Sequence, residues 1–378
     1  MDLTNNLTIH YVSLPLKTPF KTSLGVEKVR NSLILDYQSN GIRALSECAA
    51  FDTPYYSAED NSTALHVITD YLAKYLNNER GTDKEQPPSP QEFIRRASSI
   101  RGHSMAKAAV EMLLWDYFAK LEGKPLARAL GNSRGYEDVG ISLGMEEKQE
   151  LLVKKVETAA KRGYKRIKIK IEPGRDCDLV KSVRDRYPDV RLSVDANGSY
   201  SIKKDVDALK RLDEFDLEYI EQPLEYDDIF DHATLAKEIS TPICLDESIT
   251  TPRIAEQALK IGAAKVVNLK PGRLGGLANS LETARIVREN GGSVWVGGML
   301  ETGIGRSFNI ALASHELVNL PGDTSPNDEY FVKDIVSNPF VLENDGTIRV
   351  SNGAGIGVEL DMEFLLSSSR SHPAIRLF

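Results

Sequence analysis

The sequence predicts an α/β barrel of the (β/α)7β type, similar to a TIM barrel, with an α+β capping domain at its N-terminus. Three observations predict this fold. The chain has 378 residues, which fits a barrel of about 250 residues plus a smaller domain. From about residue 139, strand-like segments alternate with amphipathic helical segments, as in a parallel sheet. Ionisable residues recur at the ends of successive strand-like segments, where barrel active sites are built.

The first part of the chain reads as α+β. Leu7 to Leu14 and Ser32 to Tyr37 have strand composition. We interpret the polar stretch between them, Lys21 to Arg30, as a mobile loop, because it has turn character and no strong periodicity. In Met105 to Leu121 the apolar residues recur at helical spacing, and Gly123 follows the run.

The barrel begins where the rhythm changes. The expected strands are Val139 to Leu143, Arg166 to Ile171, Val190 to Asp195, Glu218 to Glu221, Pro242 to Asp246, Lys265 to Lys270 and Ser293 to Val296, with a weaker eighth at Leu317 to Pro321. The expected helices include Lys148 to Arg162, Ser201 to Asp213, Ala255 to Ile261 and Ala278 to Asn290. An open doubly wound sheet is the rival fold, but it usually needs a glycine-rich turn after its first strand. Ser142 to Met145 is not such a turn.

These patterns divide the chain. We expect residues 1–130 to form the capping domain and residues 131–327 to form the barrel. The last part, about 328–378, has no strand-helix rhythm and holds strand-like pieces at 347–350 and 357–360. We expect it to pack against the N-terminal domain and to complete it.

The composition limits the kinds of partner that the protein can bind. The formal net charge of −8 argues against a nucleic-acid groove or an anionic membrane surface. No apolar run approaches the roughly 20 residues of a membrane span. Cys48, Cys177 and Cys244 lie far apart, as is typical of a reduced protein without a disulfide framework. Met1 to Thr4 open the chain without a basic segment and an apolar run, so we expect a cytoplasmic protein.

The strand ends carry the chemistry. Lys168 and Lys170 end the second barrel strand, and the residues that end the next four are Asp195, Glu221, Asp246 and Lys270. From Lys170 onward the steps are 25, 26, 25 and 24 residues, one strand-helix unit each. Charged residues that merely face solvent would not be expected to recur at the same position in every strand-helix unit.

The three acids Asp195, Glu221 and Asp246 form a set of hard oxygen donors, which suits Mg²⁺ and also Mn²⁺ but not zinc. The alternative is that each acid only caps the helix that follows it. Three acids in phase, flanked by lysines, favour the metal.

The lysines supply an acid and a base. Lys168 and Lys170 are two apart, so both side chains point to one face of the strand. A neighbouring like charge and a metal ion would lower the pKa of Lys170, and a neutral lysine is a general base. Lys270 comes from the opposite side of an eight-stranded ring. The alternative, simple pairing with the acids, is stronger for Lys168 than for Lys170 and Lys270.

This set suits removal of a proton next to a substrate carboxylate. The reaction leaves a dianion, and enzymes must lower such barriers by upwards of about 8 kcal/mol. One neutral oxyanion donor supplies only about 3–4 kcal/mol, and a divalent metal can cover much of the rest. A metallohydrolase barrel is disfavoured because the six histidines are scattered and none ends a barrel strand. A barrel that only binds remains the other alternative.

The ordered motifs resemble the muconate lactonizing subgroup of the enolase superfamily, and within it the o-succinylbenzoate synthase and N-succinylamino acid racemase family. The segments that carry the resemblance are PFKTS (19–23), AVEMLLWDYFAK (109–120), RIKIKIEPG (166–174), SVDANG (193–198), IEQPL (220–224), LDES (245–248), NLKPGRLGG (268–276), GGMLETGIG (297–305) and LPGDT (320–324). Enolase-superfamily sites are already known to use a lysine or histidine base with magnesium, so that pairing is no deduction from this sequence.

The resemblance implies a role for each residue. Asp195, Glu221 and Asp246 match metal ligands, Lys170 and Lys270 the acid and base lysines, and Lys168 the first lysine of a K-x-K motif. Asn197 and Glu247 adjoin these groups. Positions that match substrate-facing ones are Ser142, Gly298, Met299 and Glu301, and Arg273 fits the motif seen where racemase activity occurs. The alternatives are a plain strand end for Ser142, a core residue for Met299 and a surface ion pair for Arg273.

The resemblance also implies the reaction. A synthase would dehydrate 2-succinyl-6-hydroxy-2,4-cyclohexadiene-1-carboxylate in menaquinone biosynthesis, and a racemase would invert an N-succinylamino acid with the same residues. A muconate cycloisomerase is the third candidate. A dipeptide epimerase would carry an Asp-x-Asp near the eighth strand, and Gly297 to Gly305 and the Leu320 region show none. A homo-oligomer is typical of the family. Two segments depart from the family pattern, Leu24 in place of an aromatic residue and Ala44 to Cys48, and both weaken the assignment of substrate.

Overall fold

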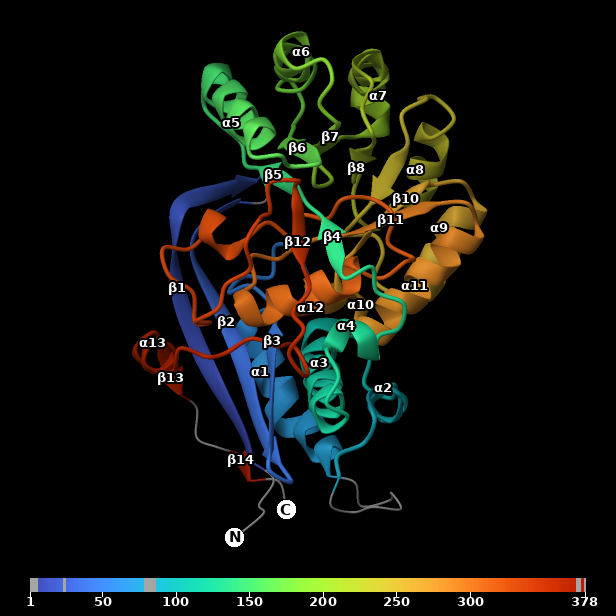
Figure 1. Cartoon of the computed structure of the whole chain (residues 1–378). Helices are drawn as coiled ribbons and strands as arrows, with labels where there is room; N and C mark the ends of the chain where they lie inside the picture. Colours follow the sequence, from blue (N-terminus) through green and yellow to red (C-terminus); the bar gives the residue numbers. More distant parts are fainter. Residues whose placement is uncertain (1–5, 23–24, 78–85, 372–374, 377–378) are drawn as a thin grey trace.

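An antiparallel sheet and a parallel barrel sheet lie side by side in the structure, a computed structural model that describes residues 6–22, 25–77, 86–371 and 375–376 (Figure 1). The opening residues Met1 to Thr4, and Ser23 and Leu24 in the departing segment, lie outside the described residues. In the described part of the chain, no helix is both long and apolar enough to cross a membrane.

The antiparallel sheet is built on one long hairpin. Strands β1 (Asn6–Thr22) and β2 (Gly25–Ser39) pair along nearly their whole length, and β3 (Ile42–Cys48) continues the sheet. The expected loop at 21–30 is therefore wrong for the residues described there, because the pairs Phe20 with Glu27 and Lys21 with Val26 belong to the hairpin. Both faces of this tip are largely exposed, so its side chains show no alternation that would reveal a strand.

Helices pack on the antiparallel sheet. They are α1 (Asn61–Val67), a π-helical turn η1 (Ile68–Leu72), a 3₁₀ turn η2 (Ala73–Leu76), α2 (Pro90–Ala97), α3 (Ser104–Leu121) and α4 (Leu126–Ala129). The predicted helix at 105–121 is confirmed as α3. It is buried on almost every side because it lies between the antiparallel sheet and the barrel, and it contacts β3 and the barrel helices α10 (Pro271–Leu274) and α11 (Leu277–Glu289).

The barrel sheet contains seven parallel strands in the order β11-β10-β9-β8-β7-β6-β5. They are β5 (Gly140–Leu143), β6 (Arg166–Lys170), β7 (Leu192–Asp195), β8 (Ile220–Glu221), β9 (Ile243–Leu245), β10 (Val266–Leu269) and β11 (Ser293–Val296). The seven predicted strands and the barrel class are confirmed. Helices α5 (Gln149–Lys161), α6 (Cys177–Arg186), α7 (Ile202–Arg211), α8 (Ile229–Leu235) and α9 (Pro252–Lys260) cover its outer side, with a 3₁₀ turn η3 (Leu212–Phe215) after α7 (Figure 1).

An irregular segment closes the ring. The eighth strand expected at 317–321 does not form as a regular strand. After α12 (Gly303–Ala313), the chain at 319–323 instead bonds to β11 through Val294 and Val296 and to the start of β5 through Gly140. A Cβ on Gly322 would meet the Val296 carbonyl oxygen at 2.9 Å. The segment therefore lies too close to β11 to leave room for the side chains that a regular strand carries on both faces.

The last part of the chain returns to the antiparallel sheet. After the 3₁₀ turn η4 (Asn327–Glu329), β12 (Thr347–Arg349) pairs with β4 (Tyr136–Asp138). Helix α13 (Met362–Ser367) follows, and β13 (Ser369–Ser371) and β14 (Ile375–Arg376) both pair with β1. The strand expected at 357–360 does not form, and only Leu360 makes an isolated bridge, to Val336.

Asp116 links three segments of the chain through hydrogen bonds. Its carboxylate is fully buried and accepts hydrogen bonds from the backbone of Leu45 and Ile356 at 2.8 Å each and from Lys120 at 2.7 Å. We expect Asp116→Ala to lower the free energy of unfolding by about 3–5 kcal/mol, because it leaves buried donors unpaired. Urea unfolding measures this loss. Asp185→Ala, which breaks an exposed pair with Lys181, should change stability by less than about 0.5 kcal/mol; equal effects of the two substitutions would contradict the argument.

Candidate active site

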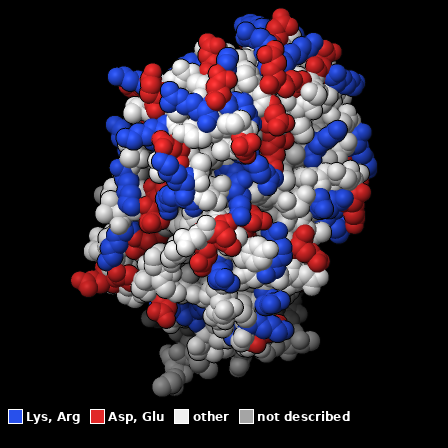
Figure 2. All heavy atoms as spheres, turned by 45° about the horizontal axis from the view of Figure 1, so that its top comes forward, with Lys and Arg blue, Asp and Glu red and all other residues white. Residues whose placement is uncertain are grey.

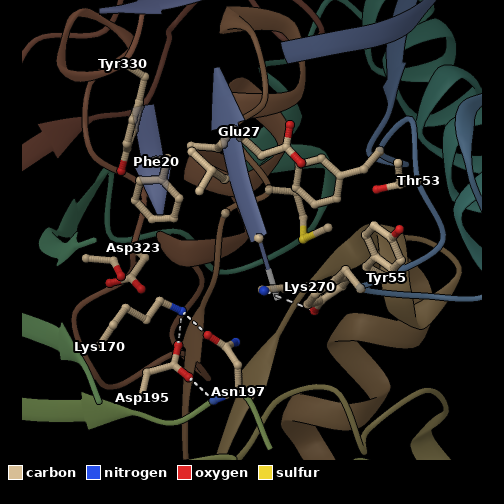
Figure 3. A pocket seen from close by; sticks show the side chains of 18 of the residues that line it. Phe20, Glu27, Thr53, Tyr55, Lys170, Asp195, Asn197, Lys270, Asp323 and Tyr330 are labelled. Carbon is tan, nitrogen blue, oxygen red and sulfur yellow. Dashed lines mark hydrogen bonds and ion pairs between the residues drawn. The ribbon is translucent and has the colours of Figure 1, made fainter. Parts of the chain in front are cut away.

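A cavity of about 390 Å³ opens at the carboxyl ends of the barrel strands, beneath the antiparallel sheet. The hairpin and the loop after β3 supply one wall, with Phe20, Val26, Glu27, Thr53, Tyr55 and Tyr56. The barrel supplies the other, with Ser142, Lys168, Lys170, Asp195, Asn197, Lys270, Gly298 and Met299. Figure 3 shows the ammonium groups of Lys170 and Lys270 on opposite sides of this space. The sequence pattern therefore brought the paired lysines to one cavity.

The second barrel strand holds two lysines on one face, as its two-residue period requires. The Lys170 Nζ lies 2.7 Å from Asp195 Oδ2 and 2.6 Å from Asn197 Oδ1. The Lys168 Nζ lies 2.6 Å from Glu221 Oε2 and 3.3 Å from Asp195 Oδ2. Both side chains are buried. Each lysine thus touches a predicted metal ligand on a neighbouring strand.

Lys270 follows β10 and faces Lys170 across the cavity. Its Nζ lies 2.9 Å from Asp246 Oδ2 and 3.0 Å from the Tyr56 hydroxyl. Arg273 lies one turn behind it in α10 and donates to Asp246, to the Tyr56 hydroxyl and to backbone carbonyls. Arg273 is only 5% exposed, so the alternative of a surface ion pair is wrong.

The buried acids lie close enough together to shift one another's pKa values. Burial, followed by repulsion from Asp195, raises the pKa of Glu221 to about 8. Burial and repulsion from Asp246 raise the pKa of Glu247 to about 7. Burial also disfavours ionised Asp246, yet the Lys270 and Arg273 cations hold the pKa of Asp246 below its usual range. The same Asp246 carboxylate raises the pKa of Lys270 against the effect of burial.

The three carboxylates Asp195, Glu221 and Asp246 are chemically suited to bind a hard divalent cation. Among the described residues no three acidic, histidine or cysteine side chains are placed to hold a metal together as they stand. A lysine ammonium lies against each of Asp195, Glu221 and Asp246 instead. Burial and the neighbouring acids raise the pKa of Glu221, and the buried Glu247 Oε2 has no hydrogen-bond partner, so a bound cation would stabilise the ionised form of both carboxyl groups. Oxygen ligands of this kind are those that Mg²⁺ and Mn²⁺ take.

Asn197 and Glu247 lie beside these groups. The Asn197 amide donates to Glu247 Oε1 at 2.8 Å while its Oδ1 accepts from Lys170. Its backbone N–H donates to Asp195 Oδ1 at 3.0 Å. Asn197 has a φ of 43°, a left-handed conformation that asparagine tolerates better than most residues. This turn directs the side-chain oxygen of Asn197 to Lys170 and its side-chain nitrogen to Glu247.

The predicted substrate positions divide into two groups. Ser142, Gly298 and Met299 line the cavity, and Met299 also packs in the core of the antiparallel half. Arg273 and Glu301 are absent from the lining residues described. Glu301 lies behind the wall, where it accepts from Asn309 at 2.9 Å and lies 3.6 Å from Arg306. A Cβ on Gly298 would meet Arg306 Nη1 at 2.9 Å, so only glycine fits there without a shift.

Several lining residues escaped the sequence reasoning, among them Tyr56, Asp323, Arg306 and Tyr330. Tyr56 sits in an irregular loop, and nothing in its neighbourhood marks it. Asp323 lies in the LPGDT segment that contributed to the resemblance. It does not end a regular strand, so the constant spacing of strand ends that identified the other acids could not identify it. Its carboxylate lies 2.7 Å from the Lys168 Nζ and also pairs with Arg166.

Charged side chains of both signs are interspersed on the face shown in Figure 2, where no extended area carries one sign alone.

Comparison with known proteins agrees with the fold. Residues 5–131 match the family described as mandelate racemase / muconate lactonizing enzyme, N-terminal domain, and residues 151–364 match the enolase C-terminal domain-like family. The structure of an enolase-superfamily member from Listeria innocua superposes with a TM-score of 0.94 at 38% identity, and covers 99% of both chains.

Curated relatives match along almost the whole length. The o-succinylbenzoate synthase of Bacillus subtilis is 40% identical over 360 residues, which is 95% of each chain. The N-succinylamino acid racemase of Thermus thermophilus is 41% identical over 358 residues, 94% of this chain and 95% of the relative. With the barrel, the lysine pair and these matches together, the chain belongs to the enolase superfamily, in its family of o-succinylbenzoate synthases and N-succinylamino acid racemases.

Proposed function

We propose that the protein is a magnesium-dependent o-succinylbenzoate synthase that also racemises N-succinylamino acids. The observation that carries the proposal is the pair Lys170 and Lys270 on opposite sides of one cavity, with Asp195, Glu221 and Asp246 each in contact with a cavity lysine. Relatives of both activities lie at 40% and 41% identity. One set of residues therefore serves both reactions.

Asp195, Glu221 and Asp246 would hold the metal, and their oxygen donors suit Mg²⁺, with Mn²⁺ as the second choice. When bound, the metal would supply charge stabilisation at the substrate carboxylate as negative charge develops there. Asn197 and Glu247 would keep the flanking lysine and acid in place through the amide that joins them.

In the synthase reaction, Lys170 removes the proton next to the substrate carboxylate. The electron pair of that C–H bond forms the new ring double bond, the C–O bond to the hydroxyl group breaks, and the hydroxide leaves as water with the proton that Lys170 carries. Lys168 and Lys270, both ammonium groups, stabilise the negative charge meanwhile. Aromatisation of the ring drives the step.

Charge supports an anionic substrate. Against the effect of burial, the neighbouring carboxylates raise the pKa of Lys168 and of Lys270, so both line the cavity as ammonium groups. A bound divalent metal would add two positive charges. A substrate carboxylate would bind among these cations, and both proposed substrates carry two carboxylates.

The racemase reaction is supported by the position of Lys270. A base on one face of the α-carbon and an acid on the other invert the centre, and the two lysines exchange roles for the opposite enantiomer. Ser142, Gly298 and Met299 would contact the substrate from the barrel side, and Tyr56 and Phe20 from the capping side.

The domain division is proposed on the same basis. Residues 1–130, completed by about 328–378, would cap the barrel of residues 131–327, since β13 and β14 pair with β1 and the hairpin supplies part of the cavity wall. Arg273 and Glu301 would act on the substrate only through the groups they contact. A homo-oligomeric state, which the family resemblance implies, and a cytoplasmic location, which the sequence suggests, remain predictions.

A spectrophotometric assay tests the proposal. Purified protein is mixed with the cyclohexadiene substrate and Mg²⁺, then with EDTA, then with excess Mg²⁺. Aromatisation that EDTA stops and Mg²⁺ restores is expected. Absence of turnover would reject the synthase assignment; N-succinylamino acids in D₂O would then test the racemase, and failure of α-proton exchange there as well would reject both.

A further inference from the structure

Each lysine in the cavity has two acceptors of different kinds. Lys170 contacts Asp195 and the side-chain Oδ1 of Asn197 (Figure 3). Lys270 contacts Asp246 and the Tyr56 hydroxyl. In each pair one acceptor is a proposed metal ligand and the other is not. A cation that takes the carboxylate thus leaves the lysine a second partner within hydrogen-bond distance.

Lys168 follows the same rule, with Asp323 as its second partner. Its Nζ lies 2.6 Å from Glu221 Oε2 and 2.7 Å from Asp323 Oδ2. The indole of Trp295 lies beneath it, with the ring centroid 4.6 Å from Nζ. The lysine is only 4% exposed, so it depends mainly on these protein partners.

Asp323 is itself held firmly. Its backbone N–H donates to the Val296 carbonyl at 2.9 Å, its own carbonyl accepts from Arg306 at 3.2 Å, and its second carboxylate oxygen pairs with the buried Arg166. Arg166 is fixed in turn over the Trp295 ring at 4.6 Å. The carboxylate therefore stays near Lys168 whatever happens at Glu221.

We propose that Asp323 is a positioning residue that accepts the Lys168 ammonium when a divalent cation occupies Glu221 and Asp195. The inference rests on the proposed metal site. Without Asp323, Lys168 would keep both carboxylates as its only anionic partners and compete with the metal for them. The same contact would keep Lys168 at the cavity wall, beside the substrate carboxylate.

Metal affinity of the resting protein tests this role apart from catalysis. Mn²⁺ is titrated into the purified chain and free Mn²⁺ is followed by electron paramagnetic resonance, with Mg²⁺ measured by competition. Asp323→Asn is expected to weaken binding by about tenfold or more, as removal of such supporting partners does at metal sites. Asp334→Asn is the matched control, because Asp334 is also buried and accepts from Gly303 and Ile335 but contacts no lysine; its affinity should stay within about twofold.

A double-mutant cycle separates this role from long-range attraction between Asp323 and the metal. If Asp323 acts through Lys168, Asp323→Asn should change affinity by less than about twofold in a Lys168→Ala background. An equal loss in both backgrounds would overturn the proposal, as would unchanged affinity in the single variant. Should Asp323→Asn fail to fold because Arg166 is left unpaired, Arg166→Met/Asp323→Asn removes both charges and is expected to show the same loss. A wild-type chain that binds neither cation would reject the metal site itself, and this inference with it.

Discussion

Lys170→Ala is expected to abolish both dehydration and racemisation, with kcat lowered roughly a thousandfold or more. General acid and base groups typically contribute 10²–10⁴-fold, and in this site Lys170 serves both reactions. Its Nζ lies against Asp195 and Asn197 and borders the cavity in which a substrate would bind. Steady-state aromatisation and loss of α-deuterium from N-succinylamino acids measure the two activities.

Lys165→Ala is the control for this prediction. Lys165 precedes the same strand but is exposed at the opposite end of the barrel, so both activities should be unchanged. A Lys170→Ala variant that keeps either activity within tenfold of wild type would show that another group removes the proton.

Lys270→Arg is expected to separate the two activities. Arginine keeps a positive charge near Asp246 but cannot act as a base, because its pKa is above about 12. Racemisation should therefore fall by about a hundredfold or more, whereas dehydration, in which Lys270 only stabilises charge, should fall less than about tenfold. Exchange in D₂O should persist for the enantiomer whose proton faces Lys170 and vanish for the other.

Equal loss of exchange from both enantiomers would contradict the arrangement of one base on each face. Lys260→Arg provides the comparison, because Lys260 is exposed in α9, where it pairs with Glu256. It should leave exchange from both enantiomers intact.

Most of the barrel and its lysines could be predicted from the sequence. Strand-helix alternation placed all seven parallel strands, and the constant step from Lys170 to Asp195, Glu221, Asp246 and Lys270 identified one ring of strand ends. This works because the geometry of a parallel barrel repeats, so a residue at one phase of the repeat must lie at one rim.

Tertiary structure decided the rest. The hairpin tip at 21–30 escaped prediction because its described residues are largely exposed, and the barrel closure at 319–323 because an irregular segment has no period. Tyr56 and Asp323 reach the cavity from such segments, from opposite ends of the chain. What periodicity encodes is which side of an element a residue occupies. Which acid a buried lysine meets, and whether it has a second partner, depends on contacts between segments that no local pattern relates.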